Sequence, residues 1–189
     1  MFTIDRFVEE CRAAVKETEA EASIREVVAR WMSRPEEIER ALGTPTQGGI
    51  VTLEHSPVLT VLQVVWDPGM TIYPHDHRMW AMIGLYGGRE DNVFYRRSPA
   101  GLQQAGGKQL VTRDAALLGK AVIHSVTNPL RQFTAAIHVY GGDFFATPRS
   151  EWDPQTLAER PYSVENALRA FREAHERWLA ESRGPGPAV

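Results

Sequence analysis

The spacing of apolar residues changes from a helical period to a strand period and back again along the chain. Apolar side chains recur every three or four positions across residues 7–15 and again across 24–32. That spacing places them on one face of a helix. Pro35, followed by two acidic residues, is typical of the first turn of a further short helix. We therefore expect segment 1–49 to form N-terminal helices packed on a β-domain, with Cys11 in their apolar face.

From residue 50 onward the apolar runs become short and rich in β-branched side chains, and glycine or proline separates them. There are about nine such runs, at 50–53, 58–66, 71–73, 80–86, 92–97, 108–112, 115–118, 121–126 and 133–140. Many short strands with frequent turn residues are typical of an antiparallel sandwich or barrel, not of a parallel α/β sheet. We expect segment 50–148 to be one all-β domain.

The helical period returns after Pro148. Ser163 precedes an apolar stripe at positions 164, 168, 171, 175 and 178, a pattern that indicates one face of a long helix with a serine at its start. We expect segment 149–183 to hold a C-terminal helix. The last stretch, 184–189, alternates glycine with proline at first and is expected to be a flexible tail.

The composition narrows the class of protein. The 189 residues carry a formal net charge of −3 and no basic block, so the chain lacks the electrostatic footprint expected for binding nucleic acid or an anionic membrane. No apolar run approaches the ~20 residues of a membrane span, and the N-terminus lacks the features of a signal peptide. The single cysteine excludes an intramolecular disulfide and a cysteine-rich metal site. We expect a cytoplasmic protein, monomeric or homodimeric.

Three of the six histidines indicate a metal site. His75 and His77 are one residue apart in a strand-like region, which puts both imidazoles on one face because strand side chains alternate. His124 lies on a later apolar run. Three neutral nitrogens on rigid strands, with coordination positions left open, are typical of a catalytic metal site. His55, in a turn, and His175, on the stripe of the last helix, are interpreted as surface or structural residues.

These residues resemble the two sequence motifs of the cupin superfamily. The positions that fit the motifs are Gly69, His75, His77, Gly88, His124 and Asn128. The glutamate ligand of the first motif is absent, because Ala81 or Met82 occupies its place, so a four-ligand site becomes a three-histidine site. The resemblance implies a cupin double-stranded β-helix, which is a jelly-roll barrel, with the helices at either end of the chain outside it.

Within the cupins, the chain resembles the cysteine dioxygenase group of thiol dioxygenases across residues 50–148. The resemblance depends on Trp66, the run 75–77, His124 and the run 137–144. It implies Fe(II) on the three histidines and the oxidation of a small thiol by O2 to its sulfinic acid. Zinc or nickel would fit the same ligands in a purified sample.

In that group a serine, a histidine and a tyrosine near the iron hydrogen-bond the substrate and oxygen. The corresponding residues here are Ala136, which lacks the serine hydroxyl, His138 and Tyr140. His138 and Tyr140 are therefore the implied catalytic residues, and their spacing puts them on one face of a strand. Asp76, between two of the implied ligands, points to the opposite face and is interpreted as structural support or surface.

Two departures from the cysteine enzymes bear on the substrate. The region that corresponds to their carboxylate-binding arginine is 47–50, which contains no arginine, and the position that corresponds to the cross-linked cysteine of the animal enzymes is near Met82. The run 80–92 is more similar to the bacterial branch that includes 3-mercaptopropionate dioxygenases. The candidate substrate contacts are Trp66, Arg78, Trp80 and Met82, although a solvated surface position is the commoner fate of an arginine.

Other functions remain open on the sequence. A three-histidine cupin can also oxidise a carbon substrate, hold zinc for hydrolysis, or bind a small molecule through a metal without turning it over. The ligand types alone accept iron or zinc. A metal-free sandwich, with the histidines placed by chance, is the blandest interpretation.

Overall fold

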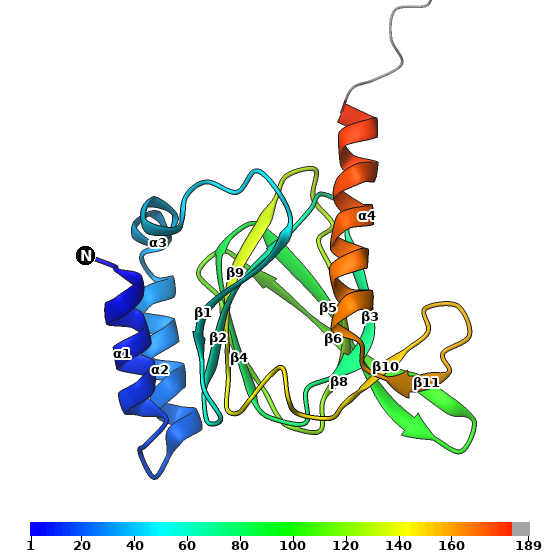
Figure 1. The fold of residues 1–189 in the computed structure, drawn as a ribbon, viewed down its shortest axis with the longest axis horizontal. Helices are drawn as coiled ribbons and strands as arrows, with labels where there is room; N and C mark the ends of the chain where they lie inside the picture. Colours follow the sequence, from blue (N-terminus) through cyan, green and yellow to red (C-terminus); the bar gives the residue numbers. More distant parts are fainter. Residues whose placement is uncertain (183–189) are drawn as a thin grey trace, which may run out of the picture.

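The structure is a computed structural model that describes residues 1–182, so the expected tail at 184–189 lies outside the described part. Two antiparallel sheets face each other (Figure 1). The five-stranded sheet has the order β1 (Gly49–His55), β2 (Thr60–Trp66), β9 (Thr134–Tyr140), β4 (Ala81–Gly87) and β7 (Ala115–Leu118). The six-stranded sheet has the order β11 (Glu159–Pro161), β10 (Ser150–Trp152), β3 (Thr71–Asp76), β8 (Ile123–Thr127), β5 (Arg89–Ser98) and β6 (Gly101–Val111).

The chain passes repeatedly from one sheet to the other. From β2 to β9 it alternates between the five-stranded and the six-stranded sheet, with only the β5–β6 hairpin staying on one side. Such crossing between two facing antiparallel sheets defines a jelly roll. The fold class expected from the sequence, a jelly-roll barrel with helices at both ends of the chain, is confirmed.

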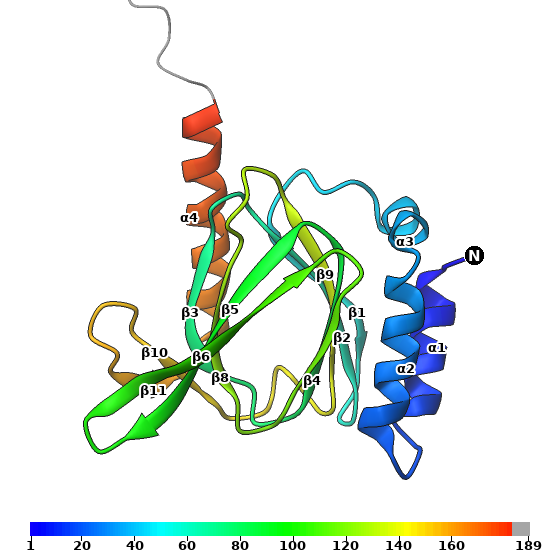
Figure 2. The same cartoon turned by 180° about the vertical axis from the view of Figure 1, so that it is seen from behind.

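Three N-terminal helices cover the outside of the five-stranded sheet: α1 (Ile4–Ala14), α2 (Ala20–Met32) and α3 (Pro35–Leu42). Their apolar faces share one buried cluster with the outward residues of β2, β4 and β9, and Figure 2 shows α1 and α2 side by side against this sheet. Cys11 is buried in this cluster, as expected. The contact is close at Gly84, where an added Cβ would lie 2.6 Å from a methyl group of Val28 on α2.

The C-terminal helix α4 (Val164–Ser182) lies against the barrel, and its C-terminal end projects beyond the sheets in both views (Figures 1 and 2). Phe171 stacks on Trp66 of β2 with ring centroids 5.3 Å apart. Farther along the helix, His175 Nδ1 lies 2.7 Å from a carboxylate oxygen of buried Asp67. His175 is therefore a structural residue, as the sequence indicated. No helix among residues 1–182 combines the length and apolar character that crossing a membrane requires.

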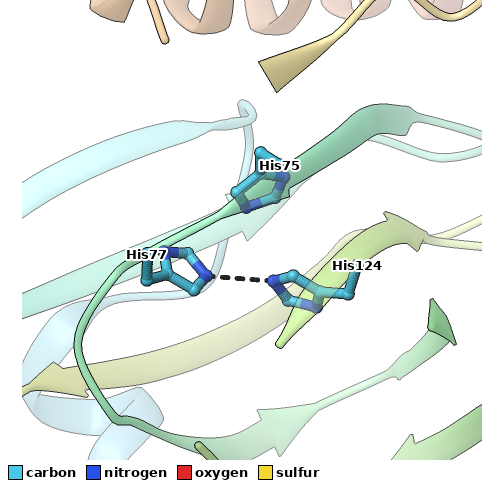
Figure 3. A group of neighbouring side chains, drawn as sticks. All are labelled: His75, His77 and His124. Carbon is cyan, nitrogen blue, oxygen red and sulfur yellow. Dashed lines mark hydrogen bonds between the residues drawn. The ribbon is translucent and has the colours of Figure 1, made fainter. Parts of the chain in front are cut away.

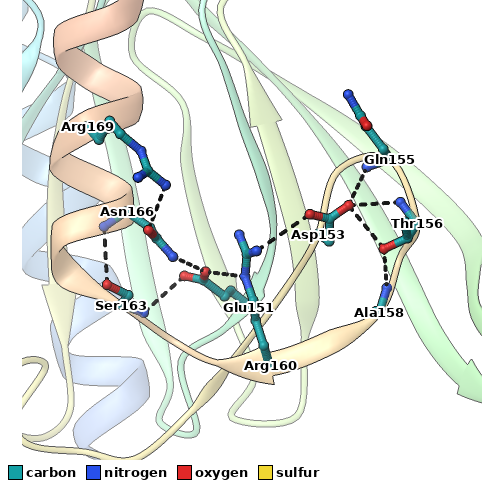
Figure 4. Close-up of polar contacts among 9 residues, drawn as sticks. All are labelled: Glu151, Asp153, Gln155, Thr156, Ala158, Arg160, Ser163, Asn166 and Arg169. Atoms are coloured by element: carbon teal, nitrogen blue, oxygen red, sulfur yellow. Dashed lines mark hydrogen bonds and ion pairs between the residues drawn. The ribbon is translucent and has the colours of Figure 1, made fainter.

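The sequence analysis missed β10 and β11, which lie within segment 149–183 before the helix begins. Buried Glu151 is the residue of β10 that pairs with His75 of β3. Its carboxylate accepts hydrogen bonds from Arg160 of β11 at 2.7 Å and from the Ser163 amide and Asn166 side chain at the start of α4, at 3.0 and 2.7 Å (Figure 4). Strands of three residues have no usable period, so only the long-range pairing defines them.

Candidate metal centre and its cavity

The three predicted metal ligands converge at one end of the barrel interior (Figure 3). His75 on β3 is the register partner of His124 on the neighbouring strand β8, and His77 follows directly after β3 ends at Asp76. One ring nitrogen from each histidine lies within 4.8 Å of the others. All three side chains are buried. The pairing of two strands thus assembles the cluster that the sequence predicted.

The hydrogen bonds of the outer ring nitrogens fix which nitrogen faces the centre. His75 Nδ1 lies 3.0 Å from the main-chain oxygen of Tyr73, and His124 Nδ1 lies 2.8 Å from Asn92 Oδ1. Each Nδ1–H donates to an oxygen, which leaves Nε2 free to bind a metal. His77 Nε2 is 3.0 Å from His124 Nε2. Two ligands at right angles, each about 2.1 Å from a metal, would be about 3.0 Å apart.

The electrostatics also suit a cation. The pKa of His75 is lowered to about 4, mainly by burial, and the charge of Arg149 contributes to the decrease. Burial is also the main reason why the pKa values of His77 and His124 lie well below the usual value, with neighbouring imidazoles adding to the effect. Neutral imidazole is the form that binds a metal. The donor set, its protonation and its spacing therefore fit a divalent metal ion.

The histidines line a small internal cavity of about 30 Å³. Its wall is mostly apolar and aromatic and is formed by Ile50, Val64, Trp66, Ile72, Val126, His138, Tyr140, Phe144, Tyr162, Ala167 and Phe171. A water molecule needs ~10–15 Å³ on this measure. The space next to the metal centre therefore holds about two or three water-sized groups, and binding a larger ligand requires the wall residues to move.

Both implied catalytic residues face this cavity from β9. The Tyr140 hydroxyl lies 3.0 Å from His138 Nδ1, and the Tyr140 ring centroid is 5.0 Å from that of His77. Burial raises the pKa of Tyr140, so the phenol keeps its proton. Ala136, one strand repeat earlier, is buried in the barrel interior and supplies no hydroxyl.

Arg149 packs against two residues of the cavity wall and was not predicted from the sequence. Its side chain is only 7% exposed and lies between two rings of the cavity wall, 3.8 Å from the Tyr162 centroid and 4.1 Å from the Phe144 centroid. One terminal nitrogen donates to the main-chain oxygen of Phe144, while Nε and Nη2 have no hydrogen-bond partner within the described chain. No sequence pattern marks this arginine, which stands in a segment interpreted as helical.

Two buried polar residues of β5 were missed as well. Asn92 orients His124, and Glu90 is fully buried with its Oε1 accepting a hydrogen bond from Trp66 Nε1 at 2.7 Å. Together with Phe94, they occupy alternate positions of the strand, and His124 pairs with Phe94 in the sheet. No signal in the sequence marks them, because residues 89–92 are all polar and do not alternate with apolar positions.

The four candidate substrate contacts are not brought together. Trp66 lines the cavity. Met82 was wrongly placed, because it belongs to the cluster under the N-terminal helices, on the opposite face of β4 from Ile83. Trp80 covers Gly141 outside the cavity wall. Arg78 is 47% exposed and pairs with Asp76 at 2.7 Å.

The structure also shows where Asp76 and His55 lie. Asp76 is buried and accepts a hydrogen bond from the Ser150 amide at 2.8 Å. It therefore supports the junction between β3 and β10 and is not a surface residue. His55 is exposed and lies 2.9 Å from Asp143, as expected for a surface histidine.

No model of a known protein family matches the chain. Among solved structures, it is similar to a cupin superfamily protein from Desulfitobacterium hafniense, with 12% identity over 54% of this chain and 85% of that one, at a TM-score of 0.42. A cupin domain from Schizosaccharomyces pombe matches at 10% identity, 55% and 66% coverage and a TM-score of 0.44. A deletion mutant of oxalate decarboxylase from Bacillus subtilis matches at 15% identity, 55% and 28% coverage and a TM-score of 0.42.

At these identities and scores, no ligand or activity of those proteins is transferred to this chain. What the molecule itself establishes is a jelly-roll barrel with a buried three-histidine cluster suited to a metal.

Proposed function

We propose that this protein is an iron-dependent dioxygenase that oxidises a small thiol carrying a carboxylate to the corresponding sulfinic acid. The observation that carries the proposal is the buried guanidinium of Arg149, which lies against the Phe144 and Tyr162 rings in the wall of the cavity that the three histidines line. Two of its nitrogens have no partner in the described chain. The guanidinium has one hydrogen bond, to the Phe144 main-chain oxygen, and burying its other N–H groups without acceptors costs free energy because they lose their water. An anionic ligand in the cavity would supply those acceptors.

The resemblance to thiol dioxygenases supports iron as the metal, held by His75, His77 and His124. When bound, Fe(II) would supply the redox chemistry that activates O2 and a positive charge that favours a thiolate ligand. The overall reaction adds both oxygen atoms to sulfur, R–SH + O2 → R–SO2H. The sulfur supplies all four electrons, so the reaction needs no external reductant.

Arg149 takes the role that the sequence analysis could not assign to residues 47–50. The planar fork of a guanidinium matches a carboxylate through two parallel hydrogen bonds. Among the described residues that line the cavity there is no carboxylate to pair with a substrate ammonium group, and buried Glu90 beside the cavity lies behind Trp66, to which one of its oxygens is hydrogen-bonded. The site therefore favours a short thiol acid without an amino group over cysteine.

The remaining wall residues orient the ligand and exclude water. Tyr140, held by His138, presents its hydroxyl beside the ring of His77. Trp66 and Phe171 close the cavity with stacked rings. Excluding water strengthens each polar contact inside the site and protects reactive species from side reactions.

The proposal is tested by oxygen uptake of the Fe(II)-loaded protein with a panel of thiols, with the sulfinate measured by mass spectrometry. The panel holds 3-mercaptopropionate, mercaptosuccinate, cysteine and cysteamine. We expect one O2 consumed per sulfinate formed, with 3-mercaptopropionate preferred and cysteamine, which lacks a carboxylate, poorest. Absence of uptake with every thiol, despite stoichiometric iron, would contradict the proposal.

The same assay separates the other functions of such a site. Substrate-dependent oxygen uptake without sulfinate indicates oxidation of a carbon substrate, and activity with zinc but not iron indicates hydrolysis. Stabilisation by a ligand without oxygen uptake indicates a binding protein.

A further inference from the structure

Glu90 is a buried carboxylate beside the cavity to which the proposed reaction gives no role. The residue lies on β5 and is fully buried. Its Oε1 accepts the hydrogen bond from Trp66 Nε1, and its Oε2 has no partner in the described chain. A fully buried acid is rarely retained unless its oxygens are used. Glu90 therefore needs a second partner.

The neighbouring imidazole of His138 also has a nitrogen that lacks a hydrogen-bond partner among the described residues. His138 is buried, and its Nε2 makes no hydrogen bond within the described residues. The same nitrogen lies 3.6 Å from Glu90 Oε1. Ala136, on the same face of β9, has no polar atom to offer it. A small rotation of either side chain brings the 3.6 Å separation into hydrogen-bond range, and the contact then gives His138 Nε2 a carboxylate acceptor.

We propose that Glu90 is a positioning residue that holds His138 in the tautomer with its proton on Nε2. With that proton directed at Glu90, the other ring nitrogen, Nδ1, carries a lone pair. Since Nδ1 is 3.0 Å from the Tyr140 hydroxyl, the hydroxyl donates its proton to His138. A single carboxylate thereby sets the direction of the whole chain Glu90–His138–Tyr140.

The consequence for the cavity is a defined hydrogen-bond polarity. A Tyr140 hydroxyl that donates to His138 presents its oxygen lone pairs to the cavity as an acceptor. In the opposite tautomer, His138 Nδ1–H would donate to Tyr140, and the hydroxyl proton would point into the cavity instead. This deepens the proposed function, on which it rests for the identity of the ligand: the acceptor suits the S–H group of an arriving thiol.

The tautomer is observed by nitrogen-15 NMR on protein labelled at histidine and loaded with Zn²⁺, a diamagnetic ion. The ring signals of His138 are assigned by their absence from His138→Gln. We expect the pattern of an Nε2–H imidazole in the wild type. In Glu90→Leu, which removes the acceptor at similar size, we expect the signals to move to the Nδ1–H pattern.

Two matched variants isolate the carboxylate. Trp66→Phe removes the other partner of Oε1 and should leave the Nε2–H pattern unchanged, and Glu90→Gln, which keeps an oxygen acceptor, should also retain it. An Nδ1–H pattern in the wild type overturns the proposal whether or not Glu90→Leu folds. An unchanged pattern in folded Glu90→Leu also overturns it.

Activity distinguishes failure of this inference from failure of the proposed function. If the wild type oxidises thiols, we expect Glu90→Leu to lower kcat by at least about tenfold with little change in KM, because Arg149 still binds the carboxylate. If the wild type oxidises no thiol but shows the expected tautomers, the proposed function fails and the role of Glu90 stands. A wild type that oxidises thiols with His138 in the Nδ1–H form overturns only the role of Glu90.

Discussion

Replacing Arg149 with methionine separates ligand recognition from folding. The side chain makes two cation–π contacts and one hydrogen bond to a main-chain oxygen, which contribute about 2 kcal/mol for each desolvated ring and about 1.5–3 kcal/mol for a charged hydrogen bond. The desolvation of a buried charge opposes these contributions by several kcal/mol. Because the two sides nearly cancel, we expect the free energy of unfolding to change by about 1 kcal/mol or less.

For substrate binding, no opposing contribution offsets the loss of the guanidinium. Two partnerless nitrogens of Arg149 are available to a carboxylate, and losing charge-assisted hydrogen bonds of this kind costs about 2–3 kcal/mol. We therefore expect kcat/KM for 3-mercaptopropionate to fall by about 30- to 150-fold, since 1.4 kcal/mol corresponds to a factor of ten. The value for cysteamine should change little, because it has no carboxylate to lose contact with.

The assays are oxygen uptake for kcat/KM and urea unfolding for stability. Arg169→Met, at an exposed arginine of α4, is the control for removing a positive charge and should affect neither substrate. An equal loss of kcat/KM for 3-mercaptopropionate and cysteamine in Arg149→Met would refute the reasoning, because a general disturbance of the cavity, not a charge contact, would then explain the loss.

Three further predictions follow from the metal cluster, the helix layer and the charges. His124→Ala should abolish stoichiometric metal binding, measured by elemental analysis, together with the rise in Tm that added Fe(II) or Zn²⁺ gives the wild type; retained metal would remove His124 from the ligand set. Gly84→Val should lower the free energy of unfolding, measured by urea titration, by about 1–3 kcal/mol, because its Cβ would lie 2.6 Å from a helix side chain. At Gly87 an added Cβ meets its nearest neighbour at 3.8 Å, so Gly87→Ala should lower it less. The hydrogen bond from Arg97 is the main reason why the pKa of Glu159 falls from 4.5 to about 2. The contribution of this ion pair to the free energy of unfolding is therefore complete above pH 4.5 and is lost as pH falls towards 2. Because Glu159 is 42% exposed, the contribution is about 1 kcal/mol or less, and Glu159→Gln should make the free energy of unfolding depend less on pH in that range.

The metal ligands could be predicted from the sequence because local rules determine their placement. A spacing of two on a strand already puts His75 and His77 on one face, and an apolar run with turn signals on both sides located the strand of His124. His138 and Tyr140 follow the same alternation, and their contact at 3.0 Å agrees with it. Where a two-residue period decides the geometry, a single sequence is sufficient.

The positions of the remaining site residues depend on strand orientation and on long-range strand pairing, which a single sequence does not reveal. β4 is buried on both faces, so its apolar pattern could not show that Met82 faces the helices and Ile83 the barrel interior. Arg149 directly precedes β10, and it packs against the cavity wall because β10 pairs with β3, a contact between distant segments with no local signal. Glu90 was not predicted because an acidic residue in a polar stretch of sequence is usually exposed to solvent. Its burial results from the facing sheet, which supplies Trp66 as its hydrogen-bond donor.

The pairing of Glu151 with His75 has a consequence for how this protein can diversify. The metal ligands lie on β3 and β8 or directly after β3. Arg149, Tyr162 and the helical wall of the cavity lie in a later segment. Glu151 connects that segment to the barrel, because it pairs with β3 and accepts hydrogen bonds from β11 and the start of α4. The candidate metal ligands and the proposed contact with the substrate carboxylate are thus encoded in separate stretches of the gene. Exchanging the segment from Arg149 to the middle of α4 could redirect the protein to ligands with different head groups while leaving the metal centre untouched, provided the incoming segment keeps the buried glutamate.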